Sequence, residues 1–182
     1  MTARKKSTKA RSASDAAAAR TANGEPRHWL MKTEPASFSF GDLMKAPRRT
    51  TSWEGVRNYQ ARNFMRDDMR VGDVVLIYHS SAEPPGFAGV AAVVSAPHPD
   101  LTAFDPGDSH YDPSSKREAP TWILVDVRGV EPLERLVALD ELRANPRLAG
   151  MRLLQRGNRL SILPVTAAEY REVRAMARTK PR

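Results

Sequence analysis

The sequence predicts a mainly β fold of the α+β class: a curved β-barrel with short peripheral helices. Continuous apolar runs rich in β-branched residues are typical of buried strands and occupy residues 73–79, 87–95 and 121–130. Only short helical patterns lie between them, so a doubly wound sheet with regularly alternating long helices is disfavoured. A length of 182 residues with 41% hydrophobic residues suits one domain with a sizeable core.

The remaining elements are shorter and are placed by their boundary residues. Further strands are expected at residues 28–32, 50–53 and 160–163. Ser39, Asn58 and Thr166 are suitable N-terminal capping residues, and we expect helices over residues 40–46, 59–66, 139–144 and 167–177. Residues 97–120 contain five prolines and many acids, which indicates a long loop. Loops of this length in compact domains are usually functional or mobile.

The net charge of +8 lies almost entirely at the two ends of the chain. Residues 1–27 hold seven Lys and Arg against two acids and lack Val, Ile, Leu and aromatic residues, so we expect a disordered basic tail. Such a tail suits a nucleic-acid-binding arm, an organelle transit peptide or a solubilising segment. Residues 178–182 form a second basic tail, and residues 28–177, with balanced charges, form the domain. Specific recognition must come from this domain, since basic tails hold phosphates non-specifically.

The absence of cysteine from the sequence excludes several kinds of site. A disulfide framework, a thiolate nucleophile and a Cys-ligated metal all need that residue. Four histidines leave little material for a metal site, and neither a transmembrane run nor a signal peptide is evident. We therefore expect a cytoplasmic protein without metal, cofactor or membrane partner. For a eukaryotic source, a nuclear or mitochondrial location is the alternative.

Several motifs, in order along the chain, resemble those of the EVE domain family. They are residues 29–35 (WLMKTEP), 53–63 (WEGVRNYQARN), 78–80 (YHS), 112–116 (DPSSK), 122–127 (WILVDV), 159–161 (RLS) and 164–165 (PV). The resemblance runs from about residue 28 to residue 176 and leaves out both tails. It implies a PUA-like fold, related to the PUA, ASCH and YTH domains.

The resemblance also implies a function. An EVE domain is expected to bind nucleic acid and to read a modified base that is flipped into an aromatic-lined pocket. The expected base is a 5-modified cytosine such as 5-methylcytosine in DNA, or a modified base in RNA. We expect a monomer that is not an enzyme. Extruding a base costs a few kcal/mol, which stacking and hydrogen bonds in the pocket recover.

Aromatic residues flanked by polar groups are the candidate pocket walls: Trp29, Trp53, Tyr59 and Tyr78. A place in the core is the alternative for each tryptophan, and Trp122, inside a plain strand, is expected in the core. Polar residues in the same motifs are candidates for hydrogen bonds to the base edge: Thr33, Glu34, Asn58, Asn63, Ser80 and Ser161. The alternatives are ion pairing of Glu34 with Lys32 or Arg57, and helix capping by Asn58.

Phosphate contacts are expected from basic residues inside the domain. Residues 45–70 carry seven Lys and Arg against three acids: Lys45, Arg48, Arg49, Arg57, Arg62, Arg66 and Arg70. Arg62 and Arg66 are spaced to share one helical face, and a solvated face is the alternative. Lys116 adds a cation in the acidic loop. The motifs also place Lys32, Val56, His79 and Arg159 in the expected base-binding set.

An enzyme is the main alternative class. Glu34, His79, Asp112 and Lys116 offer acid–base groups for an RNase- or hydrolase-like site, as in some ASCH relatives. The sequence holds no P-loop, dinucleotide-binding glycine fingerprint or nucleophile elbow, and a deaminase needs cysteines. For His79, a core or pocket-rim position is favoured over a general base. A small-ligand or protein-interaction module is the third alternative.

Overall fold

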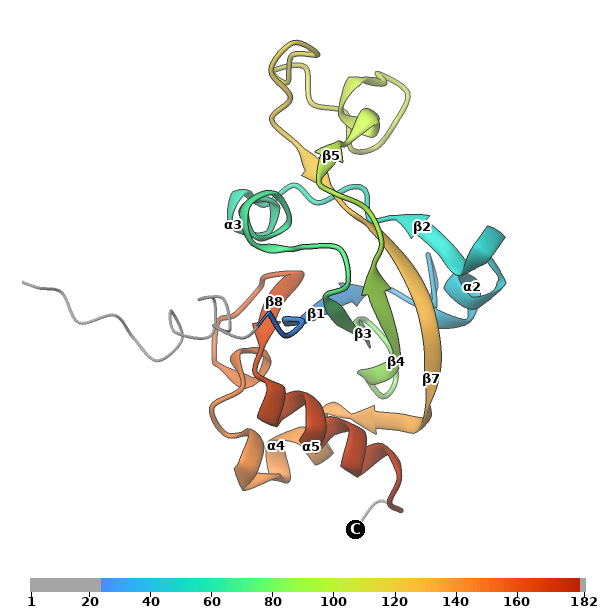
Figure 1. Ribbon diagram of the computed structural model, residues 1–182, viewed down its shortest axis with the longest axis vertical. Helices are drawn as coiled ribbons and strands as arrows, with labels where there is room; N and C mark the ends of the chain where they lie inside the picture. The colour runs from blue at the N-terminus through green and yellow to red at the C-terminus, as the bar shows by residue number, and fades with distance from the viewer. Residues whose placement is uncertain (1–23, 181–182) are drawn as a thin grey trace, which may run out of the picture.

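The computed structural model describes residues 24–180, and its centre is a curled six-stranded sheet (Figure 1). The strands, in their order across the sheet, are β2 (Thr50–Ser52), β7 (Asp126–Ala138), β4 (Gly86–Val93), β3 (Val74–His79), β1 (His28–Thr33) and β8 (Ile162–Val165). β1 and β3 are parallel, and the other neighbouring pairs are antiparallel. The mainly β fold with short helices is therefore confirmed, as a half-barrel with β2 and β8 at its edges.

The predicted strand at residues 121–130 is two strands. β6 (Ile123–Leu124) pairs with β5 (His98–Pro99) in a separate ribbon, and β7 begins at Asp126 and continues to Ala138. Residues 100–121 connect β5 to β6 and project from the sheet (Figure 1). We call residues 100–121 the lobe. It contains one short 3₁₀ helix, η3 (Leu101–Phe104), and is otherwise irregular, in line with the predicted long loop.

Short helices cover the sheet and begin at the predicted capping residues. α2 (Phe40–Lys45), α3 (Tyr59–Asn63) and α5 (Ala167–Ala177) follow Ser39, Asn58 and Thr166, whose side chains accept backbone N–H bonds. The other helices are α4 (Leu139–Ala144), the 3₁₀ turns η1 (Pro47–Arg49), η4 (Pro146–Leu148) and η5 (Arg152–Leu154), and the π-helix η2 (Phe64–Asp68). The helix predicted over residues 59–66 therefore changes to π geometry at Phe64.

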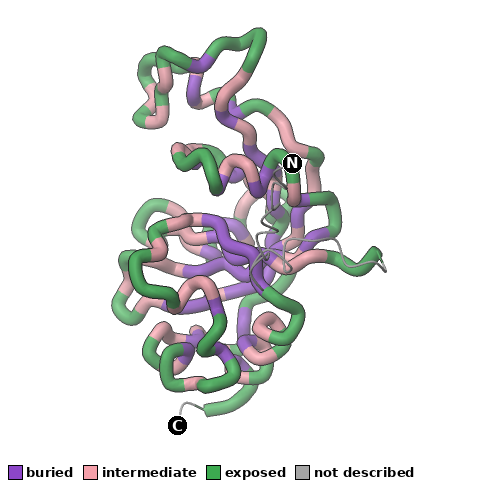
Figure 2. Tube along the Cα trace, turned by 90° about the vertical axis from the view of Figure 1, so that its left-hand side faces the viewer, coloured by how far each residue is buried: buried purple, intermediate pink, exposed green. Residues whose placement is uncertain are grey.

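The hydrophobic core consists of two clusters on opposite faces of the sheet. Trp29 and Met31 of β1 belong to the first cluster, whereas Leu30 between them belongs to the second. Since successive residues of a strand point to opposite faces, the clusters lie on either side of the sheet. α2 and α3 contribute to the first cluster, and α4 and α5 contribute to the second. Figure 2 shows the buried residues concentrated along the strands, whereas the lobe is largely exposed or half-buried.

Glycines in β4 and β7 let α2 pack closely onto the sheet. A Cβ atom at Gly89 would lie 2.3 Å from the Phe40 ring, and one at Gly129 would lie 2.7 Å from the sulfur of Met44. Such distances are too short for a side chain without moving the helix. The absence of a side chain at Gly89 thus admits the aromatic ring of Phe40 in α2.

The ends of the ordered domain differ slightly from the predicted boundaries. Arg27 is part of the domain, because its backbone N–H donates to Asp73 at 3.0 Å and its guanidinium bonds Asp68. Arg178 caps α5, and the carbonyl of Thr179 accepts a hydrogen bond from Arg135. Residues 1–23 and 181–182, which hold most of the predicted N-terminal tail and part of the C-terminal one, lie outside the described residues. Within residues 24–180, no helix is both long and apolar enough to cross a membrane.

Candidate nucleic-acid interface

Five predicted residues meet at the carboxyl ends of β1 and β3. Thr33 lies opposite His79 in the parallel pair, and the N–H of Ser80 donates to the carbonyl of Thr33 at 2.9 Å. The backbone N–H of Lys32 donates to the carbonyl of Ser161 at 2.8 Å. We call Lys32, Thr33, His79, Ser80 and Ser161 the polar end of the sheet.

Backbone contacts orient the side chains of the polar end. The Thr33 hydroxyl donates to the carbonyl of Phe38 at 2.7 Å. Nε2 of His79 accepts the backbone N–H of Phe40 at 2.9 Å, at the start of α2. Burial lowers the pKa of His79, which keeps the ring neutral and its Nε2 lone pair in this bond. A general base needs a lone pair free to take a proton, so the geometry favours the pocket-rim alternative for His79.

Three charged residues near the polar end, Lys32, Glu34 and Arg159, form no ion pair within residues 24–180. Lys32 is half-buried, and burial lowers its pKa. Glu34 is exposed and accepts a hydrogen bond from Ser81 at 3.1 Å, so the predicted alternative of pairing with Lys32 or Arg57 is wrong. Arg159 is exposed beside Leu160, which packs against both core clusters. No ion pair within residues 24–180 involves Lys32 or Arg159.

The segment from Trp53 to Asn58 connects β2 to α3. The N–H of Trp53 donates to Val125 at 3.0 Å, and the side chains of Trp53 and Val56 are buried in the first core cluster. Asn58 is exposed and caps α3, since its Oδ1 accepts the N–H groups of Gln60 and Ala61. The capping alternative is therefore confirmed for the oxygen of Asn58, and that oxygen is not free to read a base.

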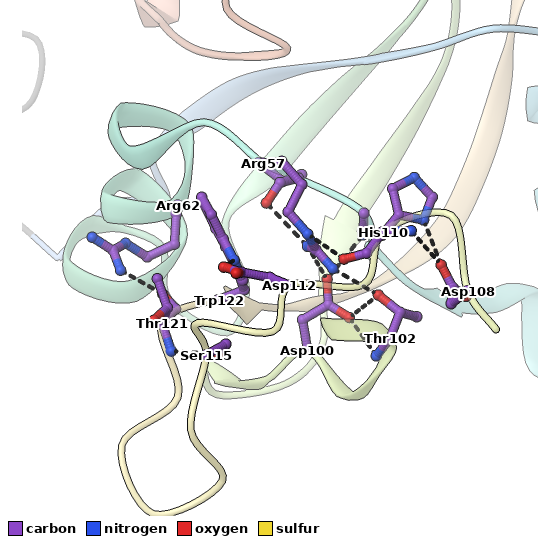
Figure 3. Close-up of polar contacts among 12 residues, drawn as sticks. Arg57, Arg62, Asp100, Thr102, Asp108, His110, Asp112, Ser115, Thr121 and Trp122 are labelled. Atoms are coloured by element: carbon purple, nitrogen blue, oxygen red, sulfur yellow. Dashed lines mark hydrogen bonds and ion pairs between the residues drawn. The ribbon is translucent and has the colours of Figure 1, made fainter. Parts of the chain in front are cut away.

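Arg57 binds this segment to the lobe instead of pointing at solvent. Its guanidinium donates to Asp100 at 2.8 Å, to the hydroxyl of Thr102 at 3.0 Å and to the carbonyl of His110 at 2.8 Å (Figure 3). Asp100 is buried and also accepts the N–H of Gly55 at 2.9 Å. The prediction that Arg57 contacts phosphates is not supported, because these internal acceptors occupy its donors.

Burial opposes ionisation of Asp100, yet its pKa lies below the usual value. Hydrogen bonds from Arg57, Thr102 and the N–H of Gly55 favour the carboxylate and outweigh the cost of burial. Asp100 therefore remains charged at neutral pH and holds the segment before α3 against the lobe.

An aromatic and arginine cluster lies beside α3. The rings of Tyr59 and Trp122 are 5.0 Å apart, and Arg62 lies over the Tyr59 ring at 5.1 Å. Arg62 also donates to the side-chain oxygen of Asn63 and to the carbonyl of Thr121. Asn63 thus orients Arg62, which differs from the predicted contact of Asn63 with a base edge.

Trp122 is buried, as the sequence predicted, but its ring belongs to this cluster and to neither of the two large core clusters. Its Nε1–H donates to Asp112 at 2.6 Å, and Arg57 lies 5.3 Å from its ring centre. Only 6% of Trp122 is exposed, but its neighbours are an exposed tyrosine and two arginines. The sequence did offer a signal for this position. The proline-rich loop ends just before residue 122, and a residue next to a long loop lies at the end of a strand, where its side chain can contact other surface segments.

Three of the four predicted pocket walls are buried in the core: Trp53, described above, Trp29 and Tyr78. Trp29 is 1% exposed, donates its Nε1–H to the buried Asp73 at 2.9 Å and packs on Phe64. Tyr78 is 4% exposed and meets Phe87 edge to face in the second cluster. The predictions for Trp29 and Tyr78 are therefore wrong, because polar neighbours along a strand do not prevent the alternate side chain from facing the core.

In the predicted basic segment, residues 45–70, some cations bind acceptors within the protein and others have no ion pair. Arg66 pairs with Asp67, and Arg70 donates to the carbonyls of Met69 and Asp67. Arg62 and Arg66 therefore have separate partners and do not act as one face. Exposed cations without an ion pair within residues 24–180 include Lys45, Arg48, Arg49, Lys116 and Arg159.

Two cavities lie away from the polar end. One of about 330 Å³ lies between β2 and the lobe, and is lined by Ser52, Glu54, His98 and residues 99–102 and 124. The other, of about 490 Å³, lies between α4 and α5. None of the predicted base-binding residues lines either cavity. Among residues 24–180, no group of three or more Asp, Glu or His side chains is placed to hold a metal ion.

The curled half-barrel, its short helices and the lobe define a small domain of the PUA-like class. The chain belongs to the EVE domain family, whose model it matches over residues 27–176. Thymocyte nuclear protein 1 from Homo sapiens is 42% identical over 171 residues, which is 85% of this chain and 75% of that protein. The protein of that name from Danio rerio is 42% identical over 170 residues, covering 84% and 73%.

Solved structures agree with this membership. The crystal structure of human THYN1 protein in complex with 5-methylcytosine containing DNA has a TM-score of 0.80 at 41% identity, covering 85% of this chain and 99% of that one. A hypothetical protein from Leishmania major has a TM-score of 0.79 at 42% identity, covering 84% and 95%. A protein from Pseudomonas putida has a TM-score of 0.78 at 40% identity, covering 82% and 99%.

Proposed function

We propose that this chain is a DNA-binding domain that reads 5-methylcytosine by holding the extruded base beside the polar end of the sheet. The observation that carries the proposal is the likeness to the human protein solved with 5-methylcytosine containing DNA, which spans 99% of that chain. Because the two chains are 41% identical over this length, the simplest inference is that both use this fold to bind 5-methylcytosine in DNA.

The chemistry of the polar end suits a cytosine. The hydroxyls of Thr33 and Ser80 donate their protons to the carbonyls of Phe38 and Thr33, so each has lone pairs left to accept from an exocyclic amine such as that of cytosine. The hydroxyl of Ser161 can donate to or accept from a base edge. We assign the apolar surface for the ring and its methyl group to Trp53 and Val56, whose side chains are buried in the first core cluster. Burying one methyl group is worth about 0.8 kcal/mol, and one extra carbon in a fitted pocket about 1–3 kcal/mol. We therefore expect a preference for methylated over plain cytosine of roughly 5-fold or more.

Phosphate contacts belong to the exposed cations that internal acceptors leave unpaired. Arg159 is exposed two residues before Ser161, and Lys116 is exposed on the lobe; Lys32, at the polar end, is half-buried and also has no ion pair within residues 24–180. We assign residues 1–27 the role of a basic arm with a net charge of +5, which adds affinity without base preference. Removing that arm is expected to lower the affinity for methylated and plain DNA equally.

The proposal is a reader that acts as a monomer and needs no cofactor. The groups proposed for acid–base chemistry have other partners: His79 accepts an N–H, Glu34 accepts a hydroxyl, and Asp112 accepts from Ser114 and Trp122. The relatives' name, thymocyte nuclear protein 1, makes a nuclear compartment the natural expectation for a eukaryotic source and a cytoplasmic one for a bacterial source.

A pair of fluorescently labelled duplexes that differ in one 5-methyl group tests the proposal. Anisotropy titrations of the full chain at one fixed salt concentration measure both dissociation constants. We expect tighter binding of the methylated duplex by roughly 5-fold or more. Equal constants for the two duplexes would refute the reading of 5-methylcytosine. A matched pair of RNA oligonucleotides shows whether a modified RNA base is preferred instead, which would also contradict the DNA proposal.

A further inference from the structure

Tyr59 combines high exposure with a fixed ring. The side chain is 60% exposed, and its ring lies 5.0 Å from that of Trp122 at an interplanar angle of 30°. Tyr111, on the lobe, is 41% exposed but makes no aromatic contact within residues 24–180. An aromatic ring that is held in solvent loses little conformational entropy when a second flat ring stacks on it.

Trp122, on which Tyr59 rests, is itself held on two sides. Its Nε1–H donates to Asp112 at 2.6 Å, and the guanidinium of Arg57 lies 5.3 Å from its ring centre. Arg57 is in turn bonded to the buried Asp100 (Figure 3). The orientation of the Tyr59 ring therefore depends on a chain of contacts that reaches into the protein.

A cation lies against this ring. Arg62 lies 5.1 Å from the centre of the Tyr59 ring, and its hydrogen bonds go to two neutral acceptors, Asn63 and the carbonyl of Thr121. Thr121 also donates its N–H to Ser115 at 3.1 Å, which places the hairpin with the exposed Lys116 next to α3. An exposed aromatic ring with an arginine beside it suits a nucleobase that is attached to phosphates.

We propose that Tyr59, supported by Trp122 and flanked by Arg62, is a stacking platform for a second nucleobase of the bound DNA. This inference rests on the proposed function, because extruding one cytosine leaves its partner and its neighbours without a stacking surface. The platform receives one of these bases and recovers part of the extrusion cost. The base comes from the opposite strand or from the position next to the methylcytosine, and the chemistry of stacking is the same in both cases.

A thermodynamic cycle between a protein variant and an abasic site tests the platform. Tyr59→Leu keeps an apolar contact with Trp122 but removes the flat ring, and Tyr59→Phe keeps the ring. The probes are methylated duplexes in which the base opposite, 5′ or 3′ to the methylcytosine is replaced by an abasic site. We expect Tyr59→Leu to weaken binding of the intact duplex by roughly 5- to 100-fold and Tyr59→Phe by less than about 2-fold.

The decisive result is the effect of Tyr59→Leu on the abasic duplexes. The loss should vanish for the duplex that lacks the stacked base, and the position of that site identifies the base. Equal losses for the intact duplex and all three abasic duplexes would overturn the platform, as would a loss no larger than that of the control Tyr111→Leu. An unfolded fraction of a variant weakens its binding to every duplex by the same factor and cancels in this comparison. Equal affinity of the unaltered protein for methylated and plain DNA would instead refute the proposed function.

Discussion

Replacing Trp53 by alanine is expected to remove the preference for methylated DNA and to destabilise the fold. Trp53 is 8% exposed and packs in the first core cluster, so its truncation should cost about 3–5 kcal/mol of unfolding free energy. It also begins the segment that ends at Asn58, and we assign it one wall of the base pocket. Urea denaturation measures the stability, and the ratio of dissociation constants for the methylated and plain duplexes measures the preference.

Two conservative variants separate the pocket role of Trp53 from its packing role. Trp53→Phe retains an aromatic ring and much of the volume. It should clearly lower the preference for methylated DNA, while the free energy of unfolding falls much less than in Trp53→Ala. Trp29→Phe is the matched control, because the indole of Trp29 is buried and hydrogen-bonded to Asp73. Trp29→Phe should lower stability and leave the preference unchanged. The reverse pattern would show that Trp53 is only a core residue.

Replacing Asp100 by asparagine is expected to loosen the segment before α3 and to cost about 2–3 kcal/mol. The change leaves Arg57, whose side chain is 22% exposed, without its carboxylate partner, and losing one partner of a largely buried pair is strongly destabilising. Urea denaturation measures the loss. Hydrogen exchange should accelerate at the backbone amides of residues 54–58 and of the lobe, while the amides of β3 and β4 keep their relative protection.

The stability lost in Asp100→Asn should depend on pH with a defined sign. Burial raises the pKa of Asp100, but hydrogen bonds, led by that of Arg57, lower it by more. The carboxylate therefore contributes stability above its unfolded pKa of 3.8, and this contribution is lost as the pH falls through the folded value. The difference between the unaltered protein and Asp100→Asn should be full at pH 7 and shrink below about pH 3.8.

Asp105→Asn is the control for this prediction. Asp105 is an exposed acid of the same lobe and accepts only the nearby N–H of Gly107 among the described residues. Its replacement should change stability by less than about 0.5 kcal/mol. Equal effects of the two substitutions would show that the Arg57–Asp100 pair does not hold the segment in place.

Local patterns were sufficient to predict the fold class. The run at residues 73–79 and the capping residues Ser39 and Thr166 act through neighbours in sequence, and the structure has a strand and helices at these places. The length of β7 was underestimated because Gly129 and Pro132 normally interrupt strands. Both lie within β7, and the pairing of β7 with β4 shifts register beside their partners.

The candidate site was less predictable because long-range contacts decide which side chains are free. Arg57 and Asp100 are 43 residues apart, and nothing near Arg57 in the sequence shows that a buried acid binds it. The same applies to Trp122, whose ring meets Tyr59 across the base of the lobe. By contrast, Thr33, Ser80 and Ser161 come together because their motifs end or precede neighbouring strands.

An NMR measurement of base-pair opening tests the central claim most directly. The imino proton of a guanine is visible only while the guanine is paired, so its signal reports whether the opposite cytosine stays in the helix. We expect the protein to remove the imino signal of the guanine opposite 5-methylcytosine while the distant base pairs keep theirs, because the methylated base leaves the stack. A saturated complex in which every imino signal persists would contradict the account.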